Sequence, residues 1–144
     1  MDGEYAPSTS ARSRKQVAEF EASGGTRANT MRGYPIVVVT MLGARSGKVR
    51  KVPLMRVEHD GQFLAVASLG GAPRHPEWYH NLRAHPHAQV QDGAGVVATT
   101  ARELAGEERA LWWDRAVAAF PDYAAYQRRT ARQIPVFVLE PDEG

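Results

Sequence analysis

Two Asp-Gly pairs, Asp60-Gly61 and Asp92-Gly93, each lie between two segments in which apolar and β-branched residues dominate. An Asp-Gly pair favours the tight turn that joins neighbouring antiparallel strands. Strands joined in this way lie side by side, so most of the sheet is expected to be antiparallel. The expected strands are 36–42, 49–58, 62–68, 88–91, 96–103 and 134–139.

Helical segments are expected around this sheet. Ser13 can cap a first helix, and Pro76 can open a second one. A third helix is expected over 106–120 with Leu111 on its apolar face, and Pro121 opens a further helical turn or two. The order β-β-β-α-β-β-α-α-β predicts a mainly β, α+β domain: an antiparallel sheet or barrel with flanking helices.

A chain of 144 residues suits one domain. Residues 1–11 are rich in Ser, Thr, Ala and Pro and are expected to be disordered, which leaves 12–144 as the domain. The absence of cysteine excludes disulfides, thiolate metal sites and a cysteine nucleophile. No apolar run is long enough to cross a bilayer and no signal peptide is visible, so the protein is expected to be cytoplasmic.

The first helix is amphipathic and begins with basic residues. Three roles are open to it: packing on the core, covering a pocket as a lid, or weak contact with a membrane surface. The last role would place the protein peripherally at the inner membrane face.

Residues 41–56 carry five positive charges and no negative charge, although the formal net charge of the chain is only +2. Backbone N–H groups near Gly43 and Gly47 can approach an anion closely, and the basic side chains supply charge. The segment is not a P-loop, because three residues separate these glycines and Val49 follows Lys48. It is expected to bind phosphate or carboxylate; the alternative is a solvated hairpin turn.

The sequence contains no recognisable nucleophile or metal site. Four histidines lie between 75 and 87, but their spacing matches no ligand motif, so no metal is expected. Ser68 lacks the G-x-S-x-G context of a nucleophile elbow. If the protein is an enzyme, a cofactor carries the reaction and the chain supplies binding and orientation.

Tyr123 and Tyr126 are three residues apart, and Phe120 continues the same stripe of a helix. Core packing is one interpretation. A pocket wall is the other, because a tyrosine presents an apolar ring together with a hydroxyl.

Four motifs together resemble the deazaflavin-dependent nitroreductase family of actinobacteria. They are GARSGKVRKVPL at 43–54, VASLGGAPRHPEWYHNL at 66–82, AREL at 101–104 and IPVF at 134–137, and the resemblance covers about residues 30–141. It implies a split β-barrel related to flavin-reductase domains. It also implies the 8-hydroxy-5-deazaflavin coenzyme F-420, with a phosphodiester and a polyglutamate tail, in preference to FMN. Both groups are anions, which gives the basic run a ligand.

The resemblance also implies roles for individual residues. Tyr123, Tyr126 and Ser68 would lie at the reacting centre. Three positions depart from the family pattern: Phe120 replaces a tyrosine of the nitroimidazole-reducing member, Leu69 replaces a lysine, and Ala44 replaces a basic residue. The cofactor-binding residues would be Ala44, Arg45, Ser46, Lys48, Arg50, Lys51, Val52, Pro53, Leu54, Met55, Val66, Ala67, Ser68, Leu69, Glu77, Trp78, Tyr79, His80, Asn81 and Tyr123.

The reaction implied by the resemblance is hydride transfer from reduced deazaflavin to an enone, a quinone or a nitro-aromatic acceptor. A non-catalytic flavin-, deazaflavin- or haem-binding protein on the same barrel is an alternative. A nucleic-acid-binding module is disfavoured, because aromatic residues are not interleaved with the basic ones. The oligomeric state stays open.

Overall fold

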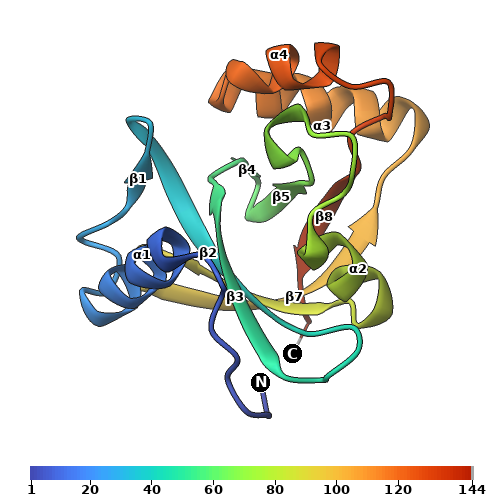
Figure 1. The fold of residues 1–144 in the computed structure, drawn as a ribbon. Helices are drawn as coiled ribbons and strands as arrows, with labels where there is room; N and C mark the ends of the chain where they lie inside the picture. Colours follow the sequence, from blue (N-terminus) through green and yellow to red (C-terminus); the bar gives the residue numbers. More distant parts are fainter. Residues whose placement is uncertain (144) are drawn as a thin grey trace.

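The computed structural model describes residues 1–143 as an eight-stranded antiparallel sheet that curls into a split barrel, flanked by four α-helices (Figure 1). The path of the sheet is β1-β2-β6-β7-β8-β5-β4, and β3 pairs with β2 alone. The strands are β1 (Thr30–Met31), β2 (Tyr34–Leu42), β3 (Val49–Met55), β4 (Glu58–His59), β5 (Gln62–Val66), β6 (His87–Asp92), β7 (Gly95–Glu103) and β8 (Val136–Pro141). The helices are α1 (Ala11–Ala22), the 3-10 turn η1 (Leu69–Gly71), α2 (Glu77–Ala84), α3 (Gly106–Ala119) and α4 (Asp122–Arg128).

Both predicted hairpins are present. In the first, Asp60 and Gly61 have φ of 52° and 80° between β4 and β5, the left-handed pair of a two-residue turn. In the second, Asp92 still pairs with Gly95, so the turn is moved one residue on and begins at Gly93. Asp92 instead accepts hydrogen bonds from the Arg56 guanidinium at 2.9 and 3.0 Å.

The N-terminal segment differs from its prediction. Ser10, not Ser13, caps α1: its hydroxyl accepts a hydrogen bond from the Ser13 backbone N–H. The preceding residues were expected to be disordered, but Glu4 and Ala6 exchange backbone hydrogen bonds with Val49 at 2.8 and 2.9 Å. These bonds hold the segment against the start of β3, on the edge that faces away from β2.

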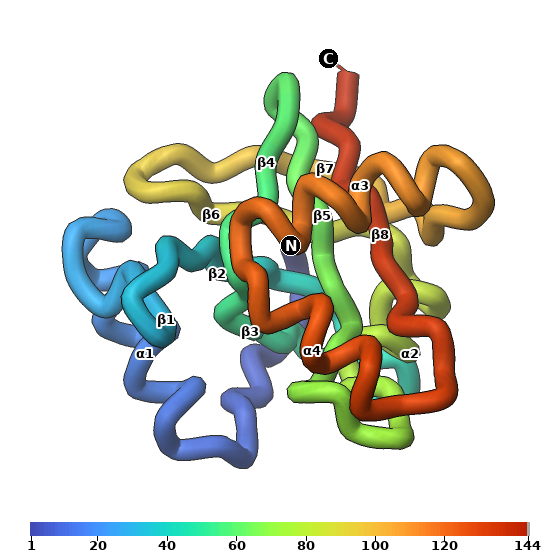
Figure 2. Tube along the Cα trace, turned by 90° about the horizontal axis from the view of Figure 1, so that it is seen from above, coloured from blue at the N-terminus to red at the C-terminus, as the bar shows by residue number. Residues whose placement is uncertain are grey.

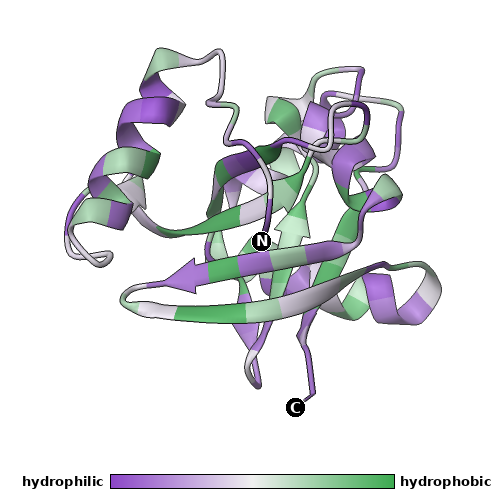
Figure 3. Cartoon of the chain, turned by 90° about the horizontal axis from the view of Figure 1, so that it is seen from below, coloured by the Kyte–Doolittle hydropathy of each residue, from purple (hydrophilic) through white to green (hydrophobic). Residues whose placement is uncertain are grey.

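Both faces of β2 are buried, which explains its unbroken apolar run. Ile36 and Val38 face a core cluster shared with α1, α3 and α4, while Val37 and Val39 face a second cluster shared with α2. Figure 3 shows hydrophobic residues concentrated in the strands and a largely hydrophilic α1. Leu111, expected on the apolar face of α3, is exposed.

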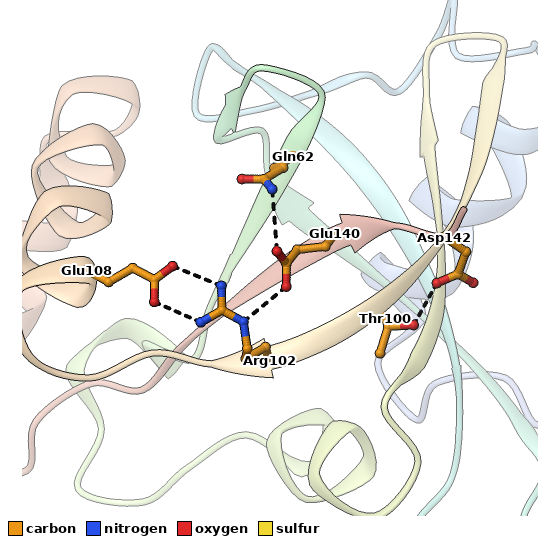
Figure 4. Close-up of polar contacts among 6 residues, drawn as sticks. All are labelled: Gln62, Thr100, Arg102, Glu108, Glu140 and Asp142. Atoms are coloured by element: carbon orange, nitrogen blue, oxygen red, sulfur yellow. Dashed lines mark hydrogen bonds and ion pairs between the residues drawn. The ribbon is translucent and has the colours of Figure 1, made fainter. Parts of the chain in front are cut away.

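An ion-pair network joins the first turn of α3 to the neighbouring strands β7 and β8 (Figure 4). Arg102 donates to both carboxylate oxygens of Glu108 at 2.7 and 2.9 Å and to Glu140 at 3.0 Å. The bonds from Arg102 lower the pKa of Glu108, so this carboxyl group stays ionised. The network orients α3, which leads directly into α4.

None of the helices in residues 1–143 is both long and apolar enough to cross a bilayer.

Candidate functional site

A cavity of about 940 Å³ is lined by residues of α1, β1, β3, η1 and α4. Figure 2 shows α1 and β1 on one side of the molecule and α4 facing them. The walls of the cavity are mostly apolar and come from segments far apart in the sequence. The lining residues are Arg12, Lys15, Gln16, Glu19, Ala28, Thr30, Met31, Arg32, Val52, Pro53, Leu54, Met55, Val66, Ser68, Leu69, Pro76, Trp78, Phe120, Tyr123 and Tyr126.

Strand β3 supplies one wall through residues 52–55. Because β3 pairs with β2 alone, its other edge is free of strand pairing, and Pro53 fits such an edge since it has no N–H to donate. The backbone of this edge is therefore available to a flat ligand. The resemblance implied that residues 51–55 line the deazaflavin ring; residues 52–55 line the cavity, whereas Lys51 does not.

The end of β5 and the turn η1 supply a second wall. Val66, Ser68 and Leu69 line the cavity, whereas Ala67 is fully buried in the core on the other side. Successive residues of an extended segment point to opposite faces, which separates Ala67 from its predicted neighbours. Leu69 is 39% exposed and has a φ of 44°, in the left-handed region that non-glycine residues rarely occupy.

The aromatic stripe expected from the sequence forms a third wall, although only its two tyrosines lie in α4 and Phe120 is the extended residue that ends α3. Phe120 lies 5.0 Å from Tyr123, ring centroid to ring centroid, and both are buried while lining the cavity. The Tyr126 hydroxyl accepts a hydrogen bond from Arg32 at 3.1 Å. Burial raises the pKa of Tyr123 far above its usual range, so its phenol stays protonated and can donate a hydrogen bond. The stripe therefore serves as core and as cavity wall together.

The loop between β2 and β3 forms a basic groove of about 530 Å³. The Ala44 N–H donates to Asn81 of α2 at 2.8 Å, which ties the loop to the helix. A Cβ at Gly43 would lie 2.8 Å from the Ser46 hydroxyl, so a larger residue there would displace this hydroxyl, which accepts a hydrogen bond from the Lys48 N–H. The groove is lined by Gly43, Ala44, Arg45, Ser46, Arg50, Glu77, His80 and Asn81.

A small cavity of about 120 Å³ joins the two spaces. It shares Val52 and Trp78 with the large cavity, and Arg50 and Asn81 with the basic groove. The site is therefore one elongated region, apolar at one end and cationic at the other.

Three further predicted site residues have other partners. Lys51 borders the small connecting cavity, but its ammonium group donates to Glu21 of α1 at 2.6 Å. Tyr79 packs in the core at 5.6 Å from Phe137 and accepts a hydrogen bond from Arg83. Lys48, predicted with them, extends to Glu4 at 3.7 Å and lines neither of the two larger spaces.

The only role at a cavity that the sequence suggested for α1 was that of a lid. Arg12, Lys15, Gln16 and Glu19 share one face of the helix, and this face lines the cavity. Gln16 donates to the Ala28 and Thr30 carbonyls at 3.0 Å each, which fixes the helix to β1 and to the segment before it. The spacing i, i+3, i+4, i+7 is the sequence signal for this face.

Within residues 1–143, no group of three or more His, Cys, Asp or Glu side chains is arranged to hold a metal ion. His75 instead stacks on Tyr79 with ring centroids 4.2 Å apart and contacts Arg132 through Nδ1 at 3.0 Å. Burial, with the charge of Arg132 as a second cause, lowers the pKa of His75.

Known proteins resemble this chain in sequence and in structure. A quinone reductase of Mycobacterium tuberculosis that depends on reduced F-420 is 35% identical over 108 residues, which are 73% of this chain and 72% of that protein. A solved F-420-H2 dependent reductase of type FDR-A is 58% identical with a TM-score of 0.71, over 74% of this chain and 94% of the other.

A second solved structure, described as a domain-swapped dimer, is 52% identical with a TM-score of 0.74, over 88% of this chain and 96% of the other. The sequence model of one family matches residues 12–141, nearly the whole chain. These matches confirm the resemblance to deazaflavin-dependent reductases, and the chain belongs to the F-420H(2)-dependent quinone reductase family.

Proposed function

We propose that this protein transfers hydride from reduced F-420 to a quinone-type acceptor. The observation that carries the proposal is the elongated site, in which an apolar cavity of about 940 Å³ continues past Trp78 into a cationic groove. Membership of the quinone reductase family supports it.

The shape and charge of the site fit this cofactor. The deazaflavin ring is flat and aromatic with polar groups on its rim; Val66 and Trp78 provide apolar walls, and the free edge of β3 provides backbone groups. The phosphodiester and carboxylate groups of its tail need cations, and Arg45 and Arg50 in the groove form no ion pair within residues 1–143. The bound, reduced ring supplies the hydride.

The chain itself supplies binding and positioning. The phenol of Tyr123, kept protonated by burial, can donate a hydrogen bond to an acceptor oxygen where negative charge develops. Tyr126 is oriented by its bond from Arg32, and α1 covers the cavity and limits the access of water. Orientation of two bound reactants is a large part of catalysis of this kind.

The same site allows alternatives that one titration separates. No histidine within residues 1–143 lines the large cavity, which favours F-420 over haem held through an imidazole. FMN has one phosphate, so it would leave part of the groove without charge partners. A nucleic acid would occupy the basic loop but leave the apolar cavity empty, and its affinity would fall steeply with salt.

The decisive experiment titrates the purified protein into F-420 and into FMN and follows ligand fluorescence. We expect saturable binding with a clear preference for F-420, followed by oxidation of the reduced cofactor by menadione that a chelator does not inhibit. Tight binding without turnover on any quinone, enone or nitro-aromatic would support a non-catalytic role. Equal affinity for FMN would contradict the role of the basic groove.

A hydrophobic quinone resides in membranes, and this gives α1 a second proposed role. Arg12, Arg14 and Lys15 are exposed and carry positive charge near the mouth of the cavity. Attraction to an anionic lipid surface would bring the cavity to its acceptor. Co-sedimentation with anionic vesicles, and its loss with neutral vesicles, tests this role.

A further inference from the structure

The guanidinium group of Arg132 lies behind the cavity wall and binds only backbone carbonyls and one histidine. Its Nε donates to the Ala72 carbonyl at 2.8 Å, and its two terminal nitrogens donate to the Ala67 and Ser68 carbonyls at 3.1 and 2.8 Å. The Nη1 atom also lies 3.0 Å from His75 Nδ1. All four partners belong to the segment 67–75, which carries the cavity-lining residues after β5.

This segment has an unfavourable backbone. Leu69, Gly70 and Gly71 have φ of 44°, 63° and 83°, three consecutive left-handed residues of which one is a leucine. The local hydrogen bond from the Gly71 N–H to the Ser68 carbonyl measures 2.9 Å. A strained conformation persists only where the surroundings over-determine it. Arg132 stabilises this conformation, because its planar guanidinium group binds three carbonyls in and beside the turn at once.

The turn is also in contact with the wall formed by α4. A side chain at Gly71 would lie 2.6 Å from the Tyr126 carbonyl, so η1 and α4 touch through their backbones. Gln127 of α4 donates to the Arg132 carbonyl at 2.8 Å and accepts from the Ile134 N–H at 2.9 Å. Arg132 is thus held by α4 on one side and holds η1 on the other.

We propose that Arg132 is a positioning residue that sets the distance between the Ser68–Leu69 wall and the tyrosine wall of the cavity. It does not line the cavity and acts only through the carbonyls it binds. The proposal rests on the proposed function, since these walls are where reduced F-420 and the acceptor would meet. A shift of η1 would change their relative orientation while leaving the basic groove intact.

Three variants test this role. Arg132→Met removes the fork, Arg132→Lys keeps the charge but not the three-way geometry, and Arg128→Met is the control. The Arg128→Met substitution removes the same charge from the same part of the chain. The exposed side chain of Arg128 forms no hydrogen bond or ion pair within residues 1–143. Each variant is measured for melting temperature, F-420 dissociation constant, and kcat and KM with menadione.

We expect Arg132→Met to lower kcat on the order of tenfold to a hundredfold, the range seen when reacting groups are misplaced. The F-420 dissociation constant should change by less than about fivefold, because the groove that holds the tail is untouched. Arg132→Lys should have a kcat similar to that of Arg132→Met, since a single ammonium nitrogen cannot reach the three carbonyls that three guanidinium nitrogens bind. Added methylguanidinium should restore part of the kcat of an Arg132→Ala variant.

A readout independent of activity is amide hydrogen exchange. The Gly71 and Ala72 amides should exchange faster in Arg132→Lys than in wild type or Arg128→Met, in the presence and absence of F-420. Unchanged exchange with unchanged kcat would overturn the proposal. So would losses of kcat, affinity and folded fraction that are proportional to one another, because that pattern marks a purely structural residue. Failure of wild-type protein to bind F-420 would refute the proposed function, and the exchange result alone would then decide whether Arg132 positions η1.

Discussion

Replacing Arg50 with Met should weaken F-420 binding, whereas replacing its neighbour Lys51 with Met should lower stability. The two residues are adjacent on β3 and point to opposite faces, and both substitutions remove one positive charge. Arg50 lines the basic groove, and no acidic residue within 1–143 forms an ion pair with it. Lys51 is neutralised by Glu21 at 2.6 Å. The two substitutions change the net charge equally, but Arg50→Met should affect F-420 binding and Lys51→Met should affect stability.

The size of each effect follows from the environment. A charge-assisted hydrogen bond contributes about 1.5 to 3 kcal/mol, and partial exposure of Arg50 with Arg45 still present reduces the loss to about 1 to 2 kcal/mol. That range corresponds to a rise of about 5-fold to 30-fold in the dissociation constant. Loss of the partly exposed Lys51–Glu21 pair should cost about 1 kcal/mol of unfolding free energy. In a protein of this size, it lowers the melting temperature by about 2 to 4 °C.

Fluorescence titration of F-420 at low and at high ionic strength measures the first effect, and thermal unfolding measures the second. The difference in affinity between wild type and Arg50→Met should shrink with added salt, because exposed charges are screened. Arg50→Glu should weaken F-420 binding more than Arg50→Met does. Equal weakening of F-420 binding by Arg50→Met and Lys51→Met would contradict the separate roles of these residues. Binding of Arg50→Met at low salt with the affinity of wild type would contradict the role of Arg50.

Three further outcomes are expected. Tyr126→Phe should change kcat/KM among quinone, enone and nitro-aromatic acceptors while the F-420 dissociation constant stays within about threefold, or about 0.7 kcal/mol; a uniform loss for every acceptor, together with a lower melting temperature, would assign Tyr126 to the core. The pKa of His75 is lowered in the folded protein, so the unfolded chain binds a proton at this position at a higher pH. The stability associated with neutral His75 is therefore complete above about pH 6.5, and it is lost as the pH falls through that value toward the folded pKa. In His75→Gln, the unfolding free energy measured with urea should depend less on pH between about pH 5 and 7. An unchanged slope against pH would exclude His75 as the source of this dependence. Arg102→Gln should lower the melting temperature without changing F-420 affinity, since its partners lie outside the cavity; a weaker affinity would show that orientation of α3 reaches the site.

Local chemistry in the sequence was enough to predict the sheet. Asp60-Gly61 forms the expected left-handed turn, because few residue pairs tolerate that backbone and the signal is contained in two positions. Element limits were less accurate: the strand expected over 49–58 ends at Met55, and the second hairpin turn begins one residue later than the Asp-Gly pair suggested. Such limits depend on which partner each backbone group finds.

The candidate site was predicted in outline by its motifs. Residues 52–55 lie along the large cavity, and Arg45, Ser46 and Arg50 lie in the basic groove. Ala67, Lys51 and Tyr79 were grouped with them by position in a motif, and the structure gives each of them core or ion-pair contacts. A motif fixes order along the chain, whereas alternation along a strand and the turns of a helix decide which side chains share a face.

The sequence by itself determined the antiparallel sheet, the cationic loop before β3 and the aromatic stripe over residues 120–126, because turn chemistry, charge and periodicity are local properties. Only the tertiary structure decided that α1 lies along the cavity and that Lys51 meets Glu21 across 30 positions. It also decided that Arg132 reaches back to the Ser68 carbonyl, 64 positions earlier. These contacts join segments with no local signal for one another, and they form because the curled sheet brings its helices and turns together around one space.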